Sequence, residues 1–336
     1  MKQGILDQSR DLLLTCTRPL LIAHVEPDGD AVGSLLGLGW ALRALGKSPL
    51  LACPDRLPRR FAFLPGFHDV TDDPQGSFDL CVALDCSDPE RMGQIALRPD
   101  LQDVPLLNID HHRTNPAFGT INLVDADAAS TTQVLYDLIC HLGVPLDERI
   151  ATCLLTGLVT DTRGFRTANV TLAVMRIVVA LMEAGAPLTE IARRGLDQQP
   201  LSVLRVWGAA LAQAEVVDGV VWTSLPLATQ QAVGHNSSGS AGLSNTLISA
   251  EEAQVAVVFK ERADGQVDVG LRAVPGFDVA GIAQALGGGG HALAAGCLVE
   301  GPLVEAQERV LSLVRTDLAR QRERLSGGNE RHPESE

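Results

Sequence analysis

The chain has 336 residues, enough for two domains, and its 27 basic and 41 acidic residues give a formal charge of -14. This acidic balance argues against a protein that grips long duplex nucleic acid by neutralising phosphates, so an anionic ligand has to be captured by local positive groups. Seven scattered cysteines without a CxxC pair, no export signal and no membrane-spanning apolar run predict a cytoplasmic protein that does not enter the membrane.

Strand-like and helical runs alternate over the first 186 residues. Residues 20–24, 78–84 and 104–109 are predicted strands, and residues 31–45 and 131–142 are predicted helices. Residues 150–160 read equally well as a buried helix or a strand. The alternation is typical of an α/β domain with a parallel sheet.

The second half of the chain predicts a smaller α/β domain. Residues 187–215 are helical in pattern and are interpreted as a connector. Residues 216–325 contain strand-like runs at 220–225, 255–259 and 267–273, then four glycines before His291, where we expect a helix to begin. Residues 326–336 are polar and predict a disordered tail.

Acidic residues and histidines follow four apolar runs of the first domain. His24, Asp28 and Asp30 follow the first strand and Asp85 follows the second. Asp110, His111 and His112 come with the third, and Asp161 ends the run at 150–160, so its placement would come from a helix end approaching the sheet. Ligands bind at the carboxyl ends of strands in open α/β sheets. The four segments together predict a two-metal centre that cleaves phosphoesters.

The donor types narrow the choice of metal. Oxygen ligands with some imidazole suit Mn²⁺, which we favour, or Mg²⁺. Two cations about 3.5–4 Å apart need a shared ligand, and Asp85 is the natural bridge. A local alternative is that Asp28 or Asp30 only caps the helix beginning near Ala31. We assign three polar residues beside these motifs to turns and caps: Ser34, Ser130 and Thr131. Cys86 is assigned to core packing.

These motifs closely resemble the DHH phosphoesterase family, which is named for its Asp-His-His triplet. Residues 287–290 with His291, and residues 294–297 behind them, resemble the glycine-rich signature of the DHH-associated C-terminal domain. The resemblance spans roughly residues 10–320. Within the family it points to the two-domain nanoRNases, which degrade short oligoribonucleotides and dephosphorylate 3'-phosphoadenosine-5'-phosphate.

The resemblance implies a role for each motif residue. One metal would be held by His24, Asp28 and Asp85, and the second by Asp30, Asp85, His111 and Asp161. Asp110 would orient a histidine, and His112 would face the substrate phosphate. In the second domain the implied substrate contacts, across a cleft between the domains, are Arg272, Gly288, Gly289, Gly290 and His291.

Four positions depart from the family pattern. Gly270 and Ala273 flank Arg272 where serines are common, Gln133 replaces a usual Glu, and Arg163 replaces a usual Gly. Arg163 either adds a phosphate contact or only decorates its loop. These departures bear on substrate preference and leave the phosphoester chemistry intact.

We therefore expect a two-metal, Mn²⁺-dependent hydrolase of short oligoribonucleotides and of 3'-phosphoadenosine-5'-phosphate. The chain length and an aromatic content of 4% argue against a long-strand exonuclease with a base-stacking platform. The alternatives are a phosphodiesterase for cyclic di-AMP or pApA and a nucleotide-binding regulator without catalysis. A regulator should lack a metal ligand, and none is missing. A homodimer is left open.

Overall fold

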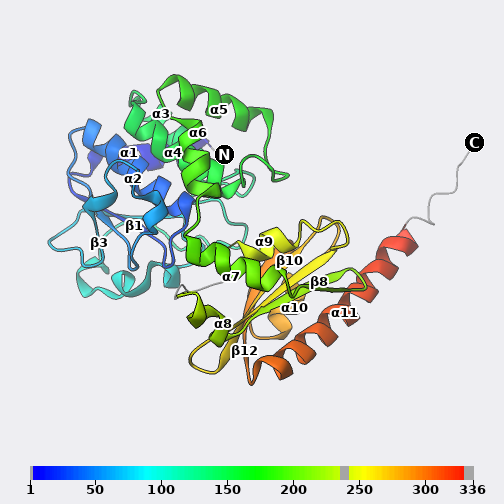
Figure 1. Cartoon of the computed structure of the whole chain (residues 1–336). Helices are drawn as coiled ribbons and strands as arrows, with labels where there is room; N and C mark the ends of the chain where they lie inside the picture. The colour runs from blue at the N-terminus through cyan, green and yellow to red at the C-terminus, as the bar shows by residue number, and fades with distance from the viewer. Residues whose placement is uncertain (1–2, 235–241, 329–336) are drawn as a thin grey trace, which may run out of the picture. The chain divides into compact units, whose positions relative to one another are not determined.

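The computed structural model describes residues 3–234 and 242–328, and the chain divides into two compact units, Met1–Gln198 and Gln199–Glu336 (Figure 1). The boundary falls inside the expected connector. In that segment, helix α6 (Leu188–Ala192) and the π-helical turn Arg193–Asp197 belong to the first unit, and α7 (Leu201–Leu211) belongs to the second.

The first unit contains a six-stranded, fully parallel sheet in the order β3-β2-β1-β4-β5-β6. The strands are β1 (Pro19–Ala23), β2 (Leu50–Ala52), β3 (Val70–Thr71), β4 (Leu80–Leu84), β5 (Leu106–Asp110) and β6 (Ile121–Val124). The predicted parallel sheet is confirmed, while β2, β3 and β6 were too short to predict. The strand order reverses between β1 and β4, and such a switch point is where open α/β sheets bind ligands.

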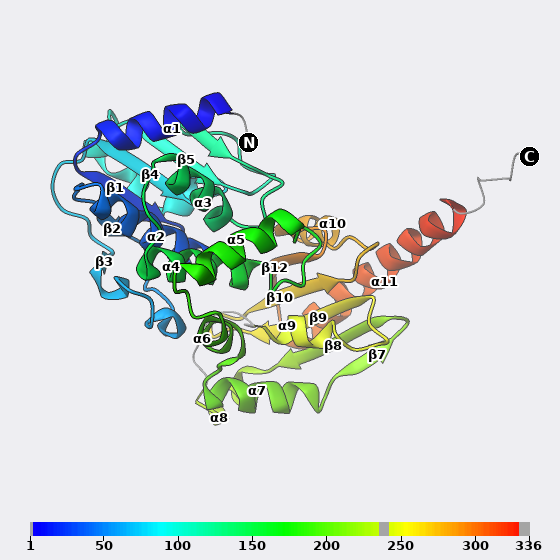
Figure 2. The same cartoon turned by 90° about the horizontal axis from the view of Figure 1, so that it is seen from above.

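Five helices accompany this sheet (Figure 2): α1 (Gln3–Thr15), α2 (Gly29–Ala44), α3 (Thr131–His141), α4 (Glu148–Asp161) and α5 (Leu172–Glu183). The run at 150–160 is therefore helical. Leu21, Val82 and Ile109 face the large core with these helices. Alternate strand residues face a smaller core on the other side, where Cys86 also packs, as expected. Burial on both faces explains why the strands read as continuous apolar runs.

The second unit contains a mixed six-stranded sheet in the order β11-β12-β10-β9-β8-β7, in which only β8 and β9 are parallel. Its strands are β7 (Glu215–Val217), β8 (Val220–Leu225), β9 (Val255–Glu261), β10 (Gln266–Ala273), β11 (Gly289–His291) and β12 (Ala294–Glu300). Its further helices are α8 (Leu227–Ala232), α9 (Leu243–Leu247), α10 (Ala280–Ala285) and α11 (Leu303–Gly328). The three predicted strands and the smaller α/β class are confirmed.

Two expectations for the second unit need correction. No helix begins at His291, because residues 289–291 form the edge strand β11 on β12. The expected tail at 326–336 begins inside α11, which continues to Gly328, and residues 329–336 lie outside the described residues.

No single helix of the described ranges has the length and apolarity to cross a membrane. The pair α5 and Leu188–Asp197, bent by 112°, meets that test of length and composition only when taken together.

Candidate metal centre

The sheet topology brings the predicted ligands together at one edge. His24 and Asp85 are the first residues after β1 and β4, and Asp110 is the last residue of β5. These three strands are adjacent and parallel, so their carboxyl ends lie side by side. Asp30 lies in the first turn of α2, and Asp161 is the last residue of α4, as the sequence suggested.

Among the described residues the donor atoms form three groups, each within 4.8 Å. The first is His24, Asp28 and Asp85, and the second is Asp30, His111 and Asp161; a third, of Asp85, His111 and His112, overlaps both. In the first, His24 Nε2 lies 3.6 Å from Asp85 Oδ2 and 3.8 Å from Asp28 Oδ1.

In the second group, His111 Nε2 lies 3.6 Å from Asp161 Oδ2 and 3.9 Å from Asp30 Oδ2. The other carboxylate oxygen of Asp85, Oδ1, is 3.8 Å from the same His111 nitrogen. Asp85 therefore stands between the groups, with one oxygen toward each.

The electrostatics of the cluster fit divalent cations. Burial and the neighbouring Asp85 and Asp161 carboxylates raise the pKa of Asp30 well above its usual value. Burial, Asp85 and Asp28 also raise the pKa of Asp161 to about 7, although His111 opposes this. Crowded carboxylates repel one another, and a bound cation would offset that repulsion. The oxygen and imidazole donors are those that Mn²⁺ and Mg²⁺ accept.

Asp28 combines the two roles that the sequence left open. Its Oδ1 accepts hydrogen bonds from the amides of Asp30 (2.9 Å) and Ala31 (3.1 Å), so it caps α2. The same side chain is about half exposed and belongs to the His24 group. Capping holds the carboxylate in place, and it does not exclude a metal role.

The two histidines of the Asp110-His111-His112 triplet have different partners. Asp110 Oδ1 accepts from His112 Nδ1 at 2.7 Å, and Asn115 Nδ2 donates to Asp110 Oδ2 at 2.6 Å. Burial would lower the pKa of His112, but the Asp110 hydrogen bond and the Asp85 charge outweigh it and raise that pKa. Asp110 thus orients His112, while His111 belongs to the metal group.

Sequence reasoning missed the part that α3 plays. The backbone amides of Thr131 and Thr132 donate to Asp30 Oδ2 (2.6 Å) and Oδ1 (3.0 Å). The Thr131 hydroxyl donates to Asp85 Oδ1 at 2.7 Å. The first turn of α3 therefore fixes one carboxylate of the second group and the carboxylate between the groups.

The sequence did contain one signal for the contact between α3 and Asp30, namely a helix-capping pattern that begins at Ser130. Ser130 caps α3 by accepting from the Gln133 amide (3.1 Å), and Gln133 Oε1 accepts from the Ala129 amide (2.7 Å). Gln at this position still supplies an acceptor, so its replacement of Glu leaves the cap intact. Ser130 is a cap as expected, whereas Thr131 does more than cap.

A second unforeseen neighbour is Arg91. Its Nη2 lies 2.7 Å from His24 Nδ1, which is also 2.7 Å from Val25 O. Because a guanidinium only donates, the Arg91 contact fits an unprotonated Nδ1, whereas the Val25 contact fits a protonated one. A metal on Nε2 requires the ring proton on Nδ1, so Val25 O would accept it and the Arg91 guanidinium would have to move away from the ring. The sequence carried no signal for Arg91, because it lies six positions beyond Asp85 in a short 3-10 segment, Pro89–Leu97.

The second unit places Arg272 and His291 on one face of its sheet. Arg272 on β10 and His291 on β11 both pair with Ala294 of the intervening strand β12. Directly paired residues share a face, so the two side chains lie about 10 Å apart over a small alanine. Arg272 Nε donates to Asn245 Oδ1 at 2.8 Å, which fixes the guanidinium.

The glycines beside His291 serve backbone packing. A Cβ on Gly288 would collide with Gly296 O, and one on Gly290 would lie 2.5 Å from Ala294 O. The position that a Cβ on Gly289 would take is open. Gly288 and Gly290 therefore allow this segment to lie close on β12. Arg163 is exposed, with φ at 52°, just beyond α4.

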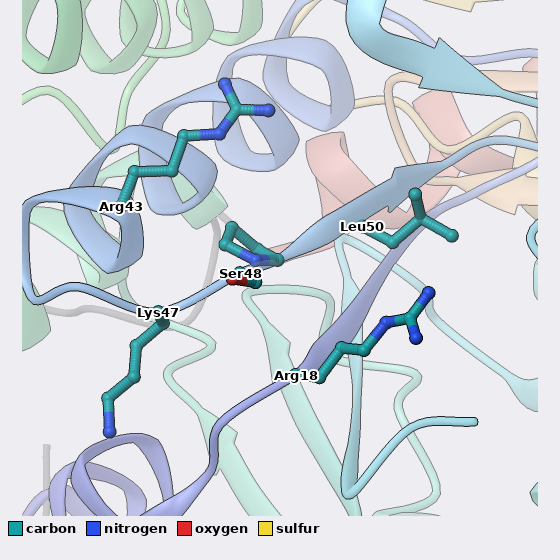
Figure 3. A pocket seen from close by; sticks show the side chains of 6 residues that line it. Arg18, Arg43, Lys47, Ser48 and Leu50 are labelled. Carbon is teal, nitrogen blue, oxygen red and sulfur yellow. The ribbon is translucent and has the colours of Figure 1, made fainter. Parts of the chain in front are cut away.

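A basic pocket lies elsewhere in the first unit. It lies beside the amino-terminal ends of β1 and β2. Its lining includes Arg18, Arg43, Lys47, Ser48 and Leu50, whose side chains point in different directions (Figure 3). Arg43 pairs with Asp69 at 3.0 Å. This pocket lies at the opposite end of the strands from the donor groups, so it places no positive charge beside them.

Comparisons with known proteins agree with the motifs. The model of the DHH family, N-terminal domain, matches residues 19–158, and the DHHA1 domain matches residues 225–319. The bifunctional oligoribonuclease and PAP phosphatase NrnA of Thermus thermophilus is 38% identical over 92% of this chain and 93% of its own. The protein of that name in Bacillus subtilis is 26% identical over 83% and 88%.

A solved structure shares the fold. An exopolyphosphatase-related protein from Bacteroides fragilis has a TM-score of 0.88 and 24% identity, and covers 97% of this chain and 98% of its own. Family models matching both halves, with a relative 38% identical over nearly the whole length, establish the family. The chain belongs to the DHH family of phosphoesterases, and it is a hydrolase of phosphoester bonds.

Proposed function

We propose that the chain hydrolyses short oligoribonucleotides to mononucleotides and 3'-phosphoadenosine-5'-phosphate to AMP, using two divalent cations, preferably Mn²⁺. The observation that carries the proposal is the pair of donor groups flanking Asp85, which together contain every ligand that the motifs implied. The similarity to the oligoribonuclease and PAP phosphatase NrnA of Thermus thermophilus supports the substrate class.

The metal ligands have separate tasks in this proposal. His24, Asp28 and Asp85 hold one cation, and Asp30, Asp85, His111 and Asp161 hold the other. Two-metal chemistry supplies activated water and neutralises charge that develops on phosphate oxygens.

His112 contacts the phosphate. With Nδ1 held by Asp110 at 2.7 Å, the ring is fixed, and Nε2 hydrogen-bonds a non-bridging oxygen or the leaving group.

Arg272 and His291 bind a second anionic part of the substrate, with the backbone of Gly288, Gly289 and Gly290 beside them. Their shared face, about 10 Å across two strand spacings, suits one or two nucleotides. The formal charge of -14 disfavours long strands, because few of their phosphates would meet a basic surface.

Substitution of ligands tests the metal assignment. Asp85→Ala and His111→Ala should each abolish release of mononucleotide from pApA, with Ser48→Ala, at the basic pocket, as a matched control that keeps activity. Metal-free enzyme should regain more activity with Mn²⁺ than with Mg²⁺. Full activity in both ligand variants would contradict the two-metal proposal.

A substrate panel separates the remaining alternatives. Turnover should be compared on pApA, 3'-phosphoadenosine-5'-phosphate, cyclic di-AMP and pyrophosphate at equal concentration. The proposal expects the first two to be cleaved fastest. Preference for cyclic di-AMP would instead assign a dinucleotide-signal phosphodiesterase, and binding without turnover of any substrate would assign a regulator.

A further inference from the structure

An arginine-rich segment follows β2 in the first unit. It contains Arg56, Arg59 and Arg60, and all three side chains are exposed. Because β2 lies parallel to β1 and next to it, the segment leaves the sheet at the same edge as the loop that begins at His24. Arg59 and Arg60 begin the 3-10 turn Arg59–Phe61, and we call these two residues the arginine pair.

Two hydrogen bonds tie the start of this segment to the loop after β1. The Glu26 amide donates to Asp55 Oδ2 at 2.7 Å, and Cys53 Sγ donates to His24 O at 3.4 Å. Both bonds hold the chain after β2 beside the loop that runs from His24 to Asp28.

The buried ring of Phe61 anchors the other end of the segment near the end of α4. Phe61 packs in the large core. A Cβ on Gly195 would lie 3.9 Å from Phe61 Cε1 and 3.2 Å from the Thr160 methyl group. Thr160 in turn packs directly on Gly29, where a Cβ would collide with its hydroxyl. A short series of contacts therefore runs from Phe61 to the first turn of α2, where Asp30 lies.

Arg60 is held over this ring. Its Cζ lies 4.8 Å from the centroid of the Phe61 ring, a distance at which a guanidinium is attracted to an aromatic face. Desolvation by the surrounding protein lowers the pKa of Arg60, and the negative charge of Asp28 opposes this. Arg60 is therefore close enough to Asp28 for their charges to act on each other, although the two side chains form no ion pair.

The arginine pair has no acidic partner within the described ranges. No hydrogen bond or ion pair joins the guanidinium of Arg59 or Arg60 to another described residue, whereas Arg43 pairs with Asp69. In a chain with a formal charge of -14, unpaired guanidinium groups at the edge that carries the donor groups favour an anionic ligand. The fork of N–H donors on a guanidinium matches the oxygens of a phosphate.

The phosphates of the proposed substrates limit what this ligand is. Both pApA and 3'-phosphoadenosine-5'-phosphate carry two phosphates. In the proposed function one of them is cleaved at the cations, and Arg272 and His291 hold the other. A third phosphate is present in the trinucleotide pApApA.

We propose that the arginine pair is a further phosphate-binding site, which holds the phosphate of a trinucleotide that neither the cations nor Arg272 and His291 take. The site would favour substrates of three or more nucleotides over dinucleotides. This inference rests on the proposed function and adds a chain-length preference to it.

Kinetics on two chain lengths test the site. Wild-type enzyme should have a lower KM for pApApA than for pApA. Arg60→Met still covers the Phe61 ring but has no charge, so it should raise the KM for pApApA about three- to tenfold and leave the KM for pApA within about twofold. The KM of this variant for pApApA should also rise less steeply with salt, because one phosphate contact is lost.

Two further variants serve as controls. Arg59→Ala should act in the same direction as Arg60→Met. Arg320→Ala removes an exposed arginine of α11, which has no part in the proposed sites, and should leave both KM values unchanged. If Arg60 only shapes its turn, Arg60→Met should change the KM of both substrates alike. That result, an unchanged KM for pApApA, or equal wild-type KM values for the two substrates would overturn the site.

Equilibrium binding separates this inference from the proposed function. Calorimetry on Asp85→Ala measures binding of pApA and pApApA without turnover. Tighter binding of pApApA, lost when Arg60→Met is added, supports the site even if the wild-type enzyme cleaves neither substrate. Equal affinity for the two oligonucleotides, or no binding of pApApA, would overturn the site even if the wild-type enzyme cleaves both.

Discussion

Thr131 donates its hydroxyl to Asp85 Oδ1 at 2.7 Å, from inside the first turn of α3, and both residues are buried. Asp85 stands between the two groups of ligands, so the hydroxyl sets the direction of a carboxylate that both groups use. Thr131 touches neither the substrate nor a cation in the proposed mechanism, and it is a positioning residue.

Thr131→Val should therefore weaken metal binding while keeping the fold. Loss of a partner that orients a ligand typically costs about 10- to 100-fold in metal affinity. Titration of Mn²⁺ into metal-free protein by calorimetry measures the change. Thr131→Ser keeps the hydroxyl and should bind nearly as the wild type does; equal loss in the Ser and Val variants would show that the methyl group, not the hydroxyl, matters.

Asp85 also carries backbone strain. Its φ is 60°, in the left-handed region, where residues with a side chain cost about 1–2 kcal/mol relative to glycine. Asp85→Gly should relieve that strain, so without metal it should be more stable to unfolding than Asp85→Ala by about 1 kcal/mol.

Both Asp85 variants should fail to bind two cations. Thermal unfolding with a chelator present, followed by metal titration, separates stability from function. Identical melting temperatures for Asp85→Gly and Asp85→Ala would argue against strain at this position.

Close packing of α4 against α2 and α3 protects the second ligand group. A Cβ on Gly157 would lie 2.5 Å from Asp30 Oδ1 and closer still to the Thr132 side chain. Gly157→Ala should push Asp30 off the α3 amides and weaken metal binding, at a stability cost of about 1–3 kcal/mol.

Gly208→Ala is the matched control for Gly157→Ala. Gly208 is exposed in α7, and, apart from its chain neighbours and the backbone of its own helix, no described atom lies within 4 Å of the position that its Cβ would take. Alanine should stabilise that helix by about 0.5–1 kcal/mol. Similar effects of the two substitutions on metal affinity would contradict a packing role for Gly157.

The clustering of the acidic and histidine side chains was predictable from the sequence, because chain position and sheet topology agree. A residue directly after a strand reaches the carboxyl edge of the sheet whenever the strands are parallel, as His24 and Asp85 do. Their supporting contacts were not predictable. Thr131 is 46 residues from Asp85 in sequence, and Arg91 is 67 from His24, so only the folded chain brings them together.

In the second unit, the sequence did not determine the structure of the glycine run at residues 287–290. Four glycines in a row were compatible with a turn before a helix and with a strand lying close on its neighbour. Residues 294–300 form the strand that β11 pairs with, and this antiparallel pairing decides for the edge strand. Composition alone carries no information about that partner.

Asn245 accepts a hydrogen bond from Arg272, and substitution of either residue tests substrate binding separately from metal binding. Asn245→Ala removes the acceptor of the 2.8 Å bond from Arg272 Nε. It should raise KM for pApA about two- to tenfold with little change in kcat, in line with the loss of one charge-assisted hydrogen bond. Arg272→Lys should have the larger effect, because an ammonium cannot bind phosphate bidentately. Unchanged Mn²⁺ affinity in both variants is the control, and a fall in kcat alone would contradict a binding role.

The acid response of the first unit can be assigned in part to Asp147, the N-cap of α4. Its Oδ1 accepts from the Ile150 amide at 2.9 Å, and Arg149 donates to its Oδ2. Burial would raise the pKa of Asp147, but these contacts outweigh it and hold that pKa below its usual value.

A carboxyl whose folded pKa is lowered stabilises the fold above its unfolded pKa, about 3.9, and loses that contribution as the pH falls through the folded value. Asp147→Asn keeps a capping acceptor without the charge, so at pH 7 it should cost about 0.5–1 kcal/mol of stability. The deficit should shrink as the pH falls below the unfolded pKa of about 3.9, and it should vanish once the carboxyl of the folded wild-type protein is protonated. Urea unfolding of both proteins across this range measures the difference, and a deficit that stays constant with pH would rule out the charge as its source.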